Sequence, residues 1–241
     1  MNISEGTRMS STVRRPELVV LDIAGTTVDE GSAVYRVLEQ TVVAHGGTPS
    51  EADIAKWHGA AKHEALRALL APADDAALQV IVEDFRARLK AAYAEHPPVP
   101  LPGVPDAIRD LRASGIKVAL NTGFDRDIVD ALLASLGWDG DSVVDTVVCG
   151  SDVAAGRPAP YMIYRAMEHS GVQDISRVLV AGDTPRDLQA GINAGAGYVV
   201  GVLSGASDEA ELSAHPHTHL LSSVADLPEL FGVTRTAATA S

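Results

Sequence analysis

Residues 18–27 read Leu-Val-Val-Leu-Asp-Ile-Ala-Gly-Thr-Thr, and this stretch decides the fold. Its four leading apolar residues predict a short buried strand. The strand ends on the carboxylate of Asp22 and runs at once into a turn that contains Gly25. In open α/β sheets, ligands bind beyond the carboxyl ends of the strands. Asp22 is therefore the first candidate functional residue of the chain.

Residues 178–187 repeat this pattern much later, as Val-Leu-Val-Ala-Gly-Asp-Thr-Pro-Arg-Asp. Asp183 ends the second apolar run, and Asp187 follows four positions on, where Pro185 favours the first turn of a helix. Magnesium takes oxygen ligands from carboxylates and from a substrate phosphate. Asp22, Asp183 and Asp187 therefore predict one divalent-metal site in a phosphoryl-transfer enzyme. The alternative is that Asp183 and Asp187 only cap a helix and complement its dipole.

The composition limits the class of protein. With 241 residues, the chain can form one large domain or a domain with an insert. Its formal charge of −13 opposes nucleic acid and anionic membrane as partners, so local cations must hold a phosphate-bearing substrate. No apolar run approaches the ~20 residues of a membrane span, and residues 1–15 lack the apolar region of a secretory signal. Cys149 is the one cysteine, so no intrachain disulfide forms, and we expect a cytoplasmic protein.

The chain has two regions that differ in their predicted secondary structure. Helical spacing of apolar residues covers the ranges 32–44, 50–57, 63–70 and 75–93, and the proline-rich residues 95–103 predict a linker. Strands and helices then alternate. The expected strands are 117–121, 143–149, 177–181 and 198–202, and the expected helices are 104–114, 127–136, 159–170 and 187–194.

This alternation predicts an α/β fold with a doubly wound parallel sheet. We assign residues 16–30 and 100–233 to the core. Residues 31–99 form a small helical cap, inserted after the first strand over the carboxyl edge of the sheet. Residues 1–15 and 234–241 are expected to be flexible tails.

A phosphate also needs hydrogen-bond donors. Thr122 and Gly123 follow a predicted strand, where a hydroxyl and nearby backbone N–H groups can clamp phosphate. Arg157 lies between two elements and can hold phosphate oxygens with two N–H groups. Taken singly, Thr122-Gly123 could be an ordinary turn and Arg157 a surface arginine.

The four motifs together resemble those of the haloacid dehalogenase superfamily, and within it the phosphonatase-like branch. They are residues 22–27, Thr122, Arg157 and residues 182–187. The resemblance covers residues 16–233 and implies a Rossmann-like core of the haloacid dehalogenase type. The helical insert is similar to the cap of that family. Because relatives often pair through the cap, the resemblance also leaves a homodimer open.

The resemblance implies a mechanism with an aspartyl-phosphate intermediate. Asp22 would attack phosphorus, and water would then hydrolyse the adduct. Mg²⁺ would be held by Asp22, the Ala24 carbonyl, Asp183 and Asp187, and would neutralise charge on the phosphoryl oxygens.

The resemblance also implies contacts to a small phosphorylated or phosphonate substrate. Thr122 and Arg157 would anchor the phosphoryl group and fix its line of attack. Further contacts are expected from Thr26, Gly123, His58 and Lys62.

Ala24 is a departure that bears on the substrate. Most phosphomonoesterases of the superfamily carry an aspartate there, which protonates the leaving group, and a methyl group cannot move protons. The phosphonatase branch also has alanine at this place and uses a cap lysine, which condenses with an aldehyde. Lys62, within residues 59–67, is the candidate for this Schiff base. Lys62 could instead contact substrate or lie on the surface, and Lys56 is a rival.

Two positions differ from the phosphonatase pattern. The phosphonatase-like branch has methionine at the position of His58 in this chain. It has a functional histidine at the position of Ala65. His63 or His58 could take over proton handling, or each could be an ordinary packing or surface residue. We therefore keep two further hypotheses, a phosphomonoesterase and a catalytically weak phosphate-binding protein.

Overall fold

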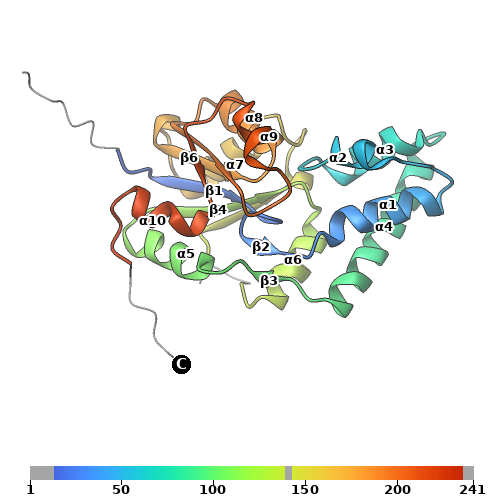
Figure 1. Ribbon diagram of the computed structural model, residues 1–241, viewed down its shortest axis with the longest axis horizontal. Coiled ribbons are helices and arrows are strands. Elements are labelled where there is room, and N and C mark those ends of the chain that lie inside the picture. The colour runs from blue at the N-terminus through green and yellow to red at the C-terminus, as the bar shows by residue number, and fades with distance from the viewer. Residues whose placement is uncertain (1–13, 139–142, 236–241) are drawn as a thin grey trace, which may run out of the picture.

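The computed structural model describes residues 14–138 and 143–235 (Figure 1). Most of the predicted tails, 1–15 and 234–241, lies outside the described residues, which include only 14–15 and 234–235 of them. A six-stranded parallel sheet has the order β5-β4-β1-β6-β7-β8. Its strands are β1 (Leu18–Asp22), β4 (Lys117–Thr122), β5 (Thr146–Cys149), β6 (Val178–Gly182), β7 (Tyr198–Val202) and β8 (His219–Leu221).

Helices cover both faces of this sheet. Successive residues of β1 point to opposite layers, because side chains alternate along a strand. Val19 and Leu21 pack with the helices of one layer, and Leu18 and Val20 with those of the other. The first layer holds α5 (Val104–Ala113) and α6 (Arg126–Ser135), and the second holds α7 (Tyr161–Ser170) and α8 (Pro185–Ala194). The prediction of a doubly wound parallel sheet is confirmed.

The connections between strands change direction beside β1. After β1 the chain continues to β4 on one side, whereas after β6 it continues to β7 on the other. Ligands of open α/β sheets bind at the carboxyl ends of strands where the connections part in this way. Asp22 ends β1 and Asp183 follows β6, so both carboxylates stand at this point.

Four helices lie between Asp29 and Val99 and pack mainly on one another at one end of the molecule (Figure 1). They are α1 (Ala33–Ala44), α2 (Glu51–Ala55), α3 (Lys62–Leu70) and α4 (Asp75–Glu95), close to the predicted ranges. Leu38, Leu66, Phe85 and Leu89 are buried between them. We call residues 31–99 the helical segment. Its standing as a separate cap domain remains a prediction.

The connections of the helical segment contain strands that the sequence analysis missed. β2 (Val28–Asp29) precedes the segment, β3 (Val99–Pro100) follows it, and the two pair antiparallel. Helix α4 ends at Glu95, before the prolines, as predicted. The two connecting chains therefore run side by side, and the segment joins the sheet at one place.

Three short elements near the C-terminus were also missed. They are strand β8 and helices α9 (Glu209–Ser213) and α10 (Leu227–Leu230). Among residues 14–138 and 143–235, no helix has both the length and the apolar character that crossing a membrane would require.

Phe85 tests the packing of the helical segment. Its side chain is 1% exposed within α4. Because a cavity would replace the ring, Phe85→Ala should lower the free energy of unfolding by about 3–5 kcal/mol. Val80→Ala on the same helix, where Val80 is 61% exposed, should change it by less than about 0.5 kcal/mol. Urea denaturation measures both values. Equal effects of the two substitutions would contradict the packing described.

Candidate active site

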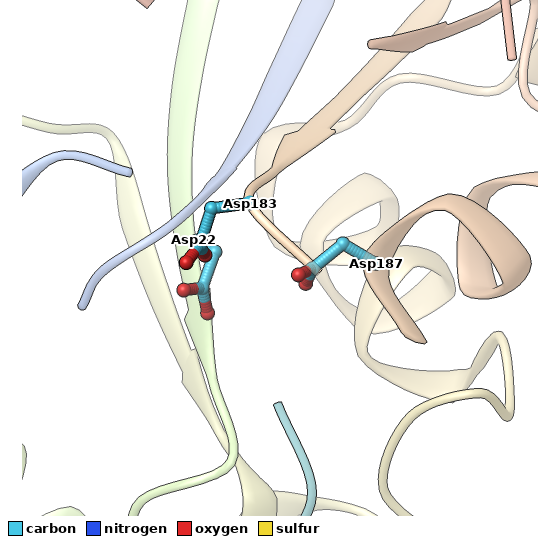
Figure 2. A group of neighbouring side chains, drawn as sticks. All are labelled: Asp22, Asp183 and Asp187. Atoms are coloured by element: carbon cyan, nitrogen blue, oxygen red, sulfur yellow. The ribbon is translucent and has the colours of Figure 1, made fainter. Parts of the chain in front are cut away.

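Three aspartates converge at the carboxyl edge of the sheet. Leu21 of β1 pairs with Ala181 of β6, so the ends of these strands lie side by side. Oxygens of Asp22, Asp183 and Asp187 all lie within 4.8 Å of one another, and all three residues are buried. In Figure 2 the side chains of Asp22 and Asp183 are adjacent, and Asp187 points toward them from the start of α8.

The carboxylates of Asp183 and Asp187 are each held by hydrogen bonds from neighbouring residues. The Thr26 hydroxyl donates to Asp183 Oδ1 (3.1 Å), and the Ala206 N–H donates to Asp183 Oδ2 (2.7 Å). The Thr184 hydroxyl and N–H donate to Asp187 Oδ2 at 2.5 and 3.1 Å, which forms a capping box at the start of α8. Asp187 thus caps the helix with one oxygen while its Oδ1 faces the aspartate cluster.

Arg157 supplies positive charge to this cluster. Its side chain is 4% exposed, which excludes a surface role. Nη1 donates to Asp22 Oδ1 at 2.7 Å and also to Asp187 Oδ1. Nε is buried and has no hydrogen-bond partner in the part of the chain that the structure describes. Buried donors are normally satisfied, so this N–H is available to a ligand oxygen.

The cluster fits a hard divalent cation. Burial, and then the neighbouring Asp22 carboxylate, raise the pKa of Asp183 to about 6. Arg157 pairs with Asp22 and Asp187 of the three buried carboxylates, and carboxylate oxygens are the ligand type that Mg²⁺ prefers. Ala24 lines the same cavity as Asp22 and Asp183, so its backbone is also near the cluster.

A cavity of about 20 Å³ lies between the sheet edge and the helical segment. This volume is roughly the space of one water molecule. It brings together most of the predicted site residues: Asp22, Ala24, Lys62, Thr122, Gly123, Arg157 and Asp183. A Cβ atom on Gly123 would come within 3.1 Å of the Ala60 carbonyl, so a larger residue there would require the sheet edge and the helical segment to move apart by a few tenths of an ångström.

Lys62 enters the cavity from the first residue of α3. The residue is 7% exposed, and Nζ donates to the Ala60 carbonyl at 2.9 Å. Burial, and then the nearby Arg157, lower the pKa of Lys62 to about 7. A neutral amine is therefore accessible near neutral pH. The rival Lys56 has a side chain 70% exposed and pairs with Asp53 on the surface.

Two predicted contact residues lie outside the cavity wall. The hydroxyl of Thr26 is committed to Asp183, and the ring of His58 stacks on Tyr35 at a centroid distance of 4.0 Å. His63 is exposed on α3. Their roles toward a substrate stay predictions.

The cavity also contains side chains that the sequence analysis did not select. Tyr35 and Val34 come from α1, Phe124 follows Thr122, and Thr184 follows Asp183. Thr184 and Phe124 are adjacent to selected residues, a signal that could have found them. Tyr35 sits within an ordinary helical pattern, and nothing in its neighbourhood in the sequence distinguishes it.

A model of the haloacid dehalogenase-like hydrolase family matches residues 16–195, well over half of the chain. The chain belongs to this family. Phosphonoacetaldehyde hydrolase of Paraburkholderia xenovorans is 31% identical over 205 residues, covering 79% of this chain and 76% of that protein. Phosphonoacetaldehyde hydrolase of Bacillus cereus is 31% identical over 207 residues, covering 80% and 77%.

Solved structures agree on the fold. A phosphonoacetaldehyde hydrolase like protein from Oleispira antarctica has a TM-score of 0.78 and 21% identity, covering 96% of this chain and 95% of that chain. A haloacid dehalogenase-like hydrolase from Bacteroides fragilis has a TM-score of 0.76 and 19% identity, covering 88% and 100%. The fold and hydrolase class predicted from the four motifs are confirmed.

The raised pKa of Asp183 predicts a pH dependence for this haloacid dehalogenase-like hydrolase. Without metal, the folded protein binds the Asp183 proton more tightly than the unfolded chain, so this group's contribution to stability falls as pH rises from about 4 to 6. Asp183→Asn removes that titration. Relative to the unsubstituted protein, its free energy of unfolding should rise by about 2–3 kcal/mol between pH 4 and 7.

Urea denaturation in a chelator at several pH values measures this difference. Adding Mg²⁺ at pH 7 provides the control, because the metal should stabilise the unsubstituted protein more than the variant. A difference that stays constant with pH would contradict the burial of an ionised Asp183.

Proposed function

We propose that this hydrolase cleaves a small phosphonate that carries an aldehyde, such as phosphonoacetaldehyde. Asp22 would form the aspartyl-phosphate, and Lys62 would form an imine with the aldehyde. The observation that carries the proposal is the Lys62 amine, which is buried in the same cavity as Asp22. The phosphonoacetaldehyde hydrolases about 30% identical to this chain support the same class of substrate.

The sheet edge would supply the phosphoryl chemistry. An Asp22 oxygen attacks phosphorus, a P–O bond forms and the P–C bond breaks. The Arg157 hydrogen bond holds Asp22 in one orientation, and the free Nε of Arg157 can donate to a phosphoryl oxygen. Thr122 and Gly123, at the end of β4, face the same space and would complete the phosphoryl site.

A magnesium ion would be held by Asp22, Asp183, Asp187 and the Ala24 carbonyl. When bound, it neutralises negative charge on the phosphoryl oxygens. Asp183 is fixed for this role by Thr26 and Ala206.

The helical segment would supply the chemistry of the leaving group. Ala24 cannot donate a proton to the leaving group. A carbon leaving group therefore needs another group that accepts the electron pair of the breaking bond. Neutral Lys62 attacks the aldehyde carbon, a C–N bond forms, and the carbonyl oxygen departs as water. The resulting protonated imine accepts the electron pair of the breaking P–C bond and becomes an enamine. Protonation and hydrolysis of the enamine release the product aldehyde and restore Lys62.

The cavity wall favours a short organic group. Besides Lys62 and Tyr35, the helical segment contributes Val34, Gly59 and Ala60, which offer no side-chain hydrogen bonds to the hydroxyls of a sugar. A small-molecule phosphomonoesterase is the second candidate. Ala65 favours it, because the phosphonatase pattern has a functional histidine at that position.

Asp22 provides the first test of the proposal. Asp22→Ala should abolish phosphate release while the circular dichroism spectrum stays unchanged, because the nucleophile is lost and the fold is not. Beryllofluoride with Mg²⁺ should bind beside Asp22 in crystals of the unsubstituted protein. Appreciable residual turnover, or binding elsewhere, would refute the assignment.

Lys62 provides the second test. Incubation with phosphonoacetaldehyde and borohydride should leave a reduced adduct on Lys62, detected by mass spectrometry of peptides. Lys62→Arg keeps the positive charge but cannot form an imine, so P–C cleavage should fall by about 10²–10⁴-fold. Lys56→Arg, on the exposed rival lysine, is the matched control and should retain full activity.

The same assays separate the two candidate functions. Brisk phosphate release from a phosphomonoester, without an adduct on Lys62, would favour the phosphomonoesterase and overturn the imine.

A further inference from the structure

Tyr35 makes three contacts around the reactive lysine. Its hydroxyl accepts the N–H of Gly59 at 3.2 Å, its ring stacks on His58, and Lys62 Nζ lies 5.2 Å from the ring centroid. Tyr35 belongs to α1, whereas the other three residues precede or begin α3. One side chain therefore connects the first helix of the segment to the turn that carries Lys62.

The hydroxyl contact fixes that turn. Gly59 has a φ of +71°, and a Cβ atom there would lie 2.5 Å from Thr184 Oγ1. The turn is thus confined between Thr184 of the sheet edge and Tyr35 of the helical segment. Its next residue, Ala60, presents the carbonyl that accepts Lys62 Nζ. Loosening Gly59 would release the carbonyl that orients the amine.

The contact of the Tyr35 ring affects the charge of Lys62 Nζ. Lys62 must be neutral to attack an aldehyde, yet its nitrogen is positive once the protonated imine has formed. Burial and the guanidinium groups of Arg157 and Arg186 disfavour positive charge at Nζ, whereas Asp22 and Glu30 favour it. His58 is a further titratable neighbour, and Lys62 and His58 disfavour each other's positive charge. The face of a tyrosine ring within about 6 Å attracts a cation.

We propose that Tyr35 is a positioning residue for Lys62, holding its turn through the hydroxyl and supporting positive charge on Nζ through the ring. This inference rests on the proposed imine function. It goes beyond that function by assigning a third participant, from a helix that carries neither Asp22 nor Lys62. A purely space-filling Tyr35 would leave the properties of Nζ unchanged when replaced by another apolar side chain.

A titration of Lys62 without substrate tests the ring. The rate at which acetic anhydride labels Lys62, followed by mass spectrometry across pH, reports the pKa of the amine. Tyr35→Leu removes the ring face and should lower that pKa by about 0.5–1 unit. Tyr35→Phe keeps the face and should leave it unchanged, as should Tyr161→Leu, which removes an exposed tyrosine of α7. An unchanged or higher pKa in Tyr35→Leu would overturn the role of the ring.

Turnover of phosphonoacetaldehyde tests the hydroxyl. Tyr35→Phe loses the hydrogen bond to Gly59 and should lower kcat about fivefold, with KM little changed, because one hydrogen bond contributes about 1 kcal/mol. An unchanged kcat would overturn the role of the hydroxyl. If Tyr35→Leu does not fold, Tyr35→Met takes its place in the titration and decides the role of the ring.

The two proposals fail separately. If borohydride traps no adduct on Lys62 in the unsubstituted protein, the imine function fails, whereas the titration still reports on Tyr35. If the adduct forms in the unsubstituted protein, and Tyr35→Leu matches it in both titration and trapping rate, only the inference about Tyr35 fails.

Discussion

Mutual repulsion among three buried carboxylates is the constraint on which the rest of the site depends. Asp22, Asp183 and Asp187 converge, and Arg157 pairs with Asp22 and Asp187, so the three carboxylates still need further positive charge or protons. Burial, and then repulsion by the Asp22 carboxylate, raise the pKa of Asp183. The neighbouring backbone is adapted to it. A Cβ atom on Gly25 would approach Asp183 Oδ2 to 2.5 Å, so this turn requires glycine.

The pairing of Asp22 with Asp183 was predictable because parallel strands bring their carboxyl ends to one edge, whatever the separation in sequence. The long helices were predictable from their periodicity. Strands β2 and β3 were not, because two residues cannot show a period of two, and the prolines of the second indicated a linker. Strand β8 begins at His219, in an alternation of histidines that gave no apolar signal.

The alternatives set for Asp187 proved compatible. The sequence offered either a helix cap or a metal ligand, whereas one carboxylate oxygen caps α8 and the other faces Asp22 and Arg157. A carboxylate has two oxygens, and a capping bond fixes the direction of the second. Tyr35, in contrast, could not be selected from the sequence. Its significance depends on a turn that follows more than twenty residues later in the chain, and such a contact exists only after the helices pack.

The two halves of the proposed chemistry come from different parts of the chain. In this proposal the sheet edge provides the oxygens and the arginine that act on phosphorus, whereas the groups near the leaving group come from α1, from the turn before α3 and from the first residue of α3. A change of leaving group therefore requires substitutions only in the helical segment. Ala24 is the exception, because it lies in the turn after Asp22 and removes the proton donor there. In the proposed chemistry the charge of Lys62 then becomes decisive, and burial, Arg157 and the ring of Tyr35 are the features of this structure that act on that charge.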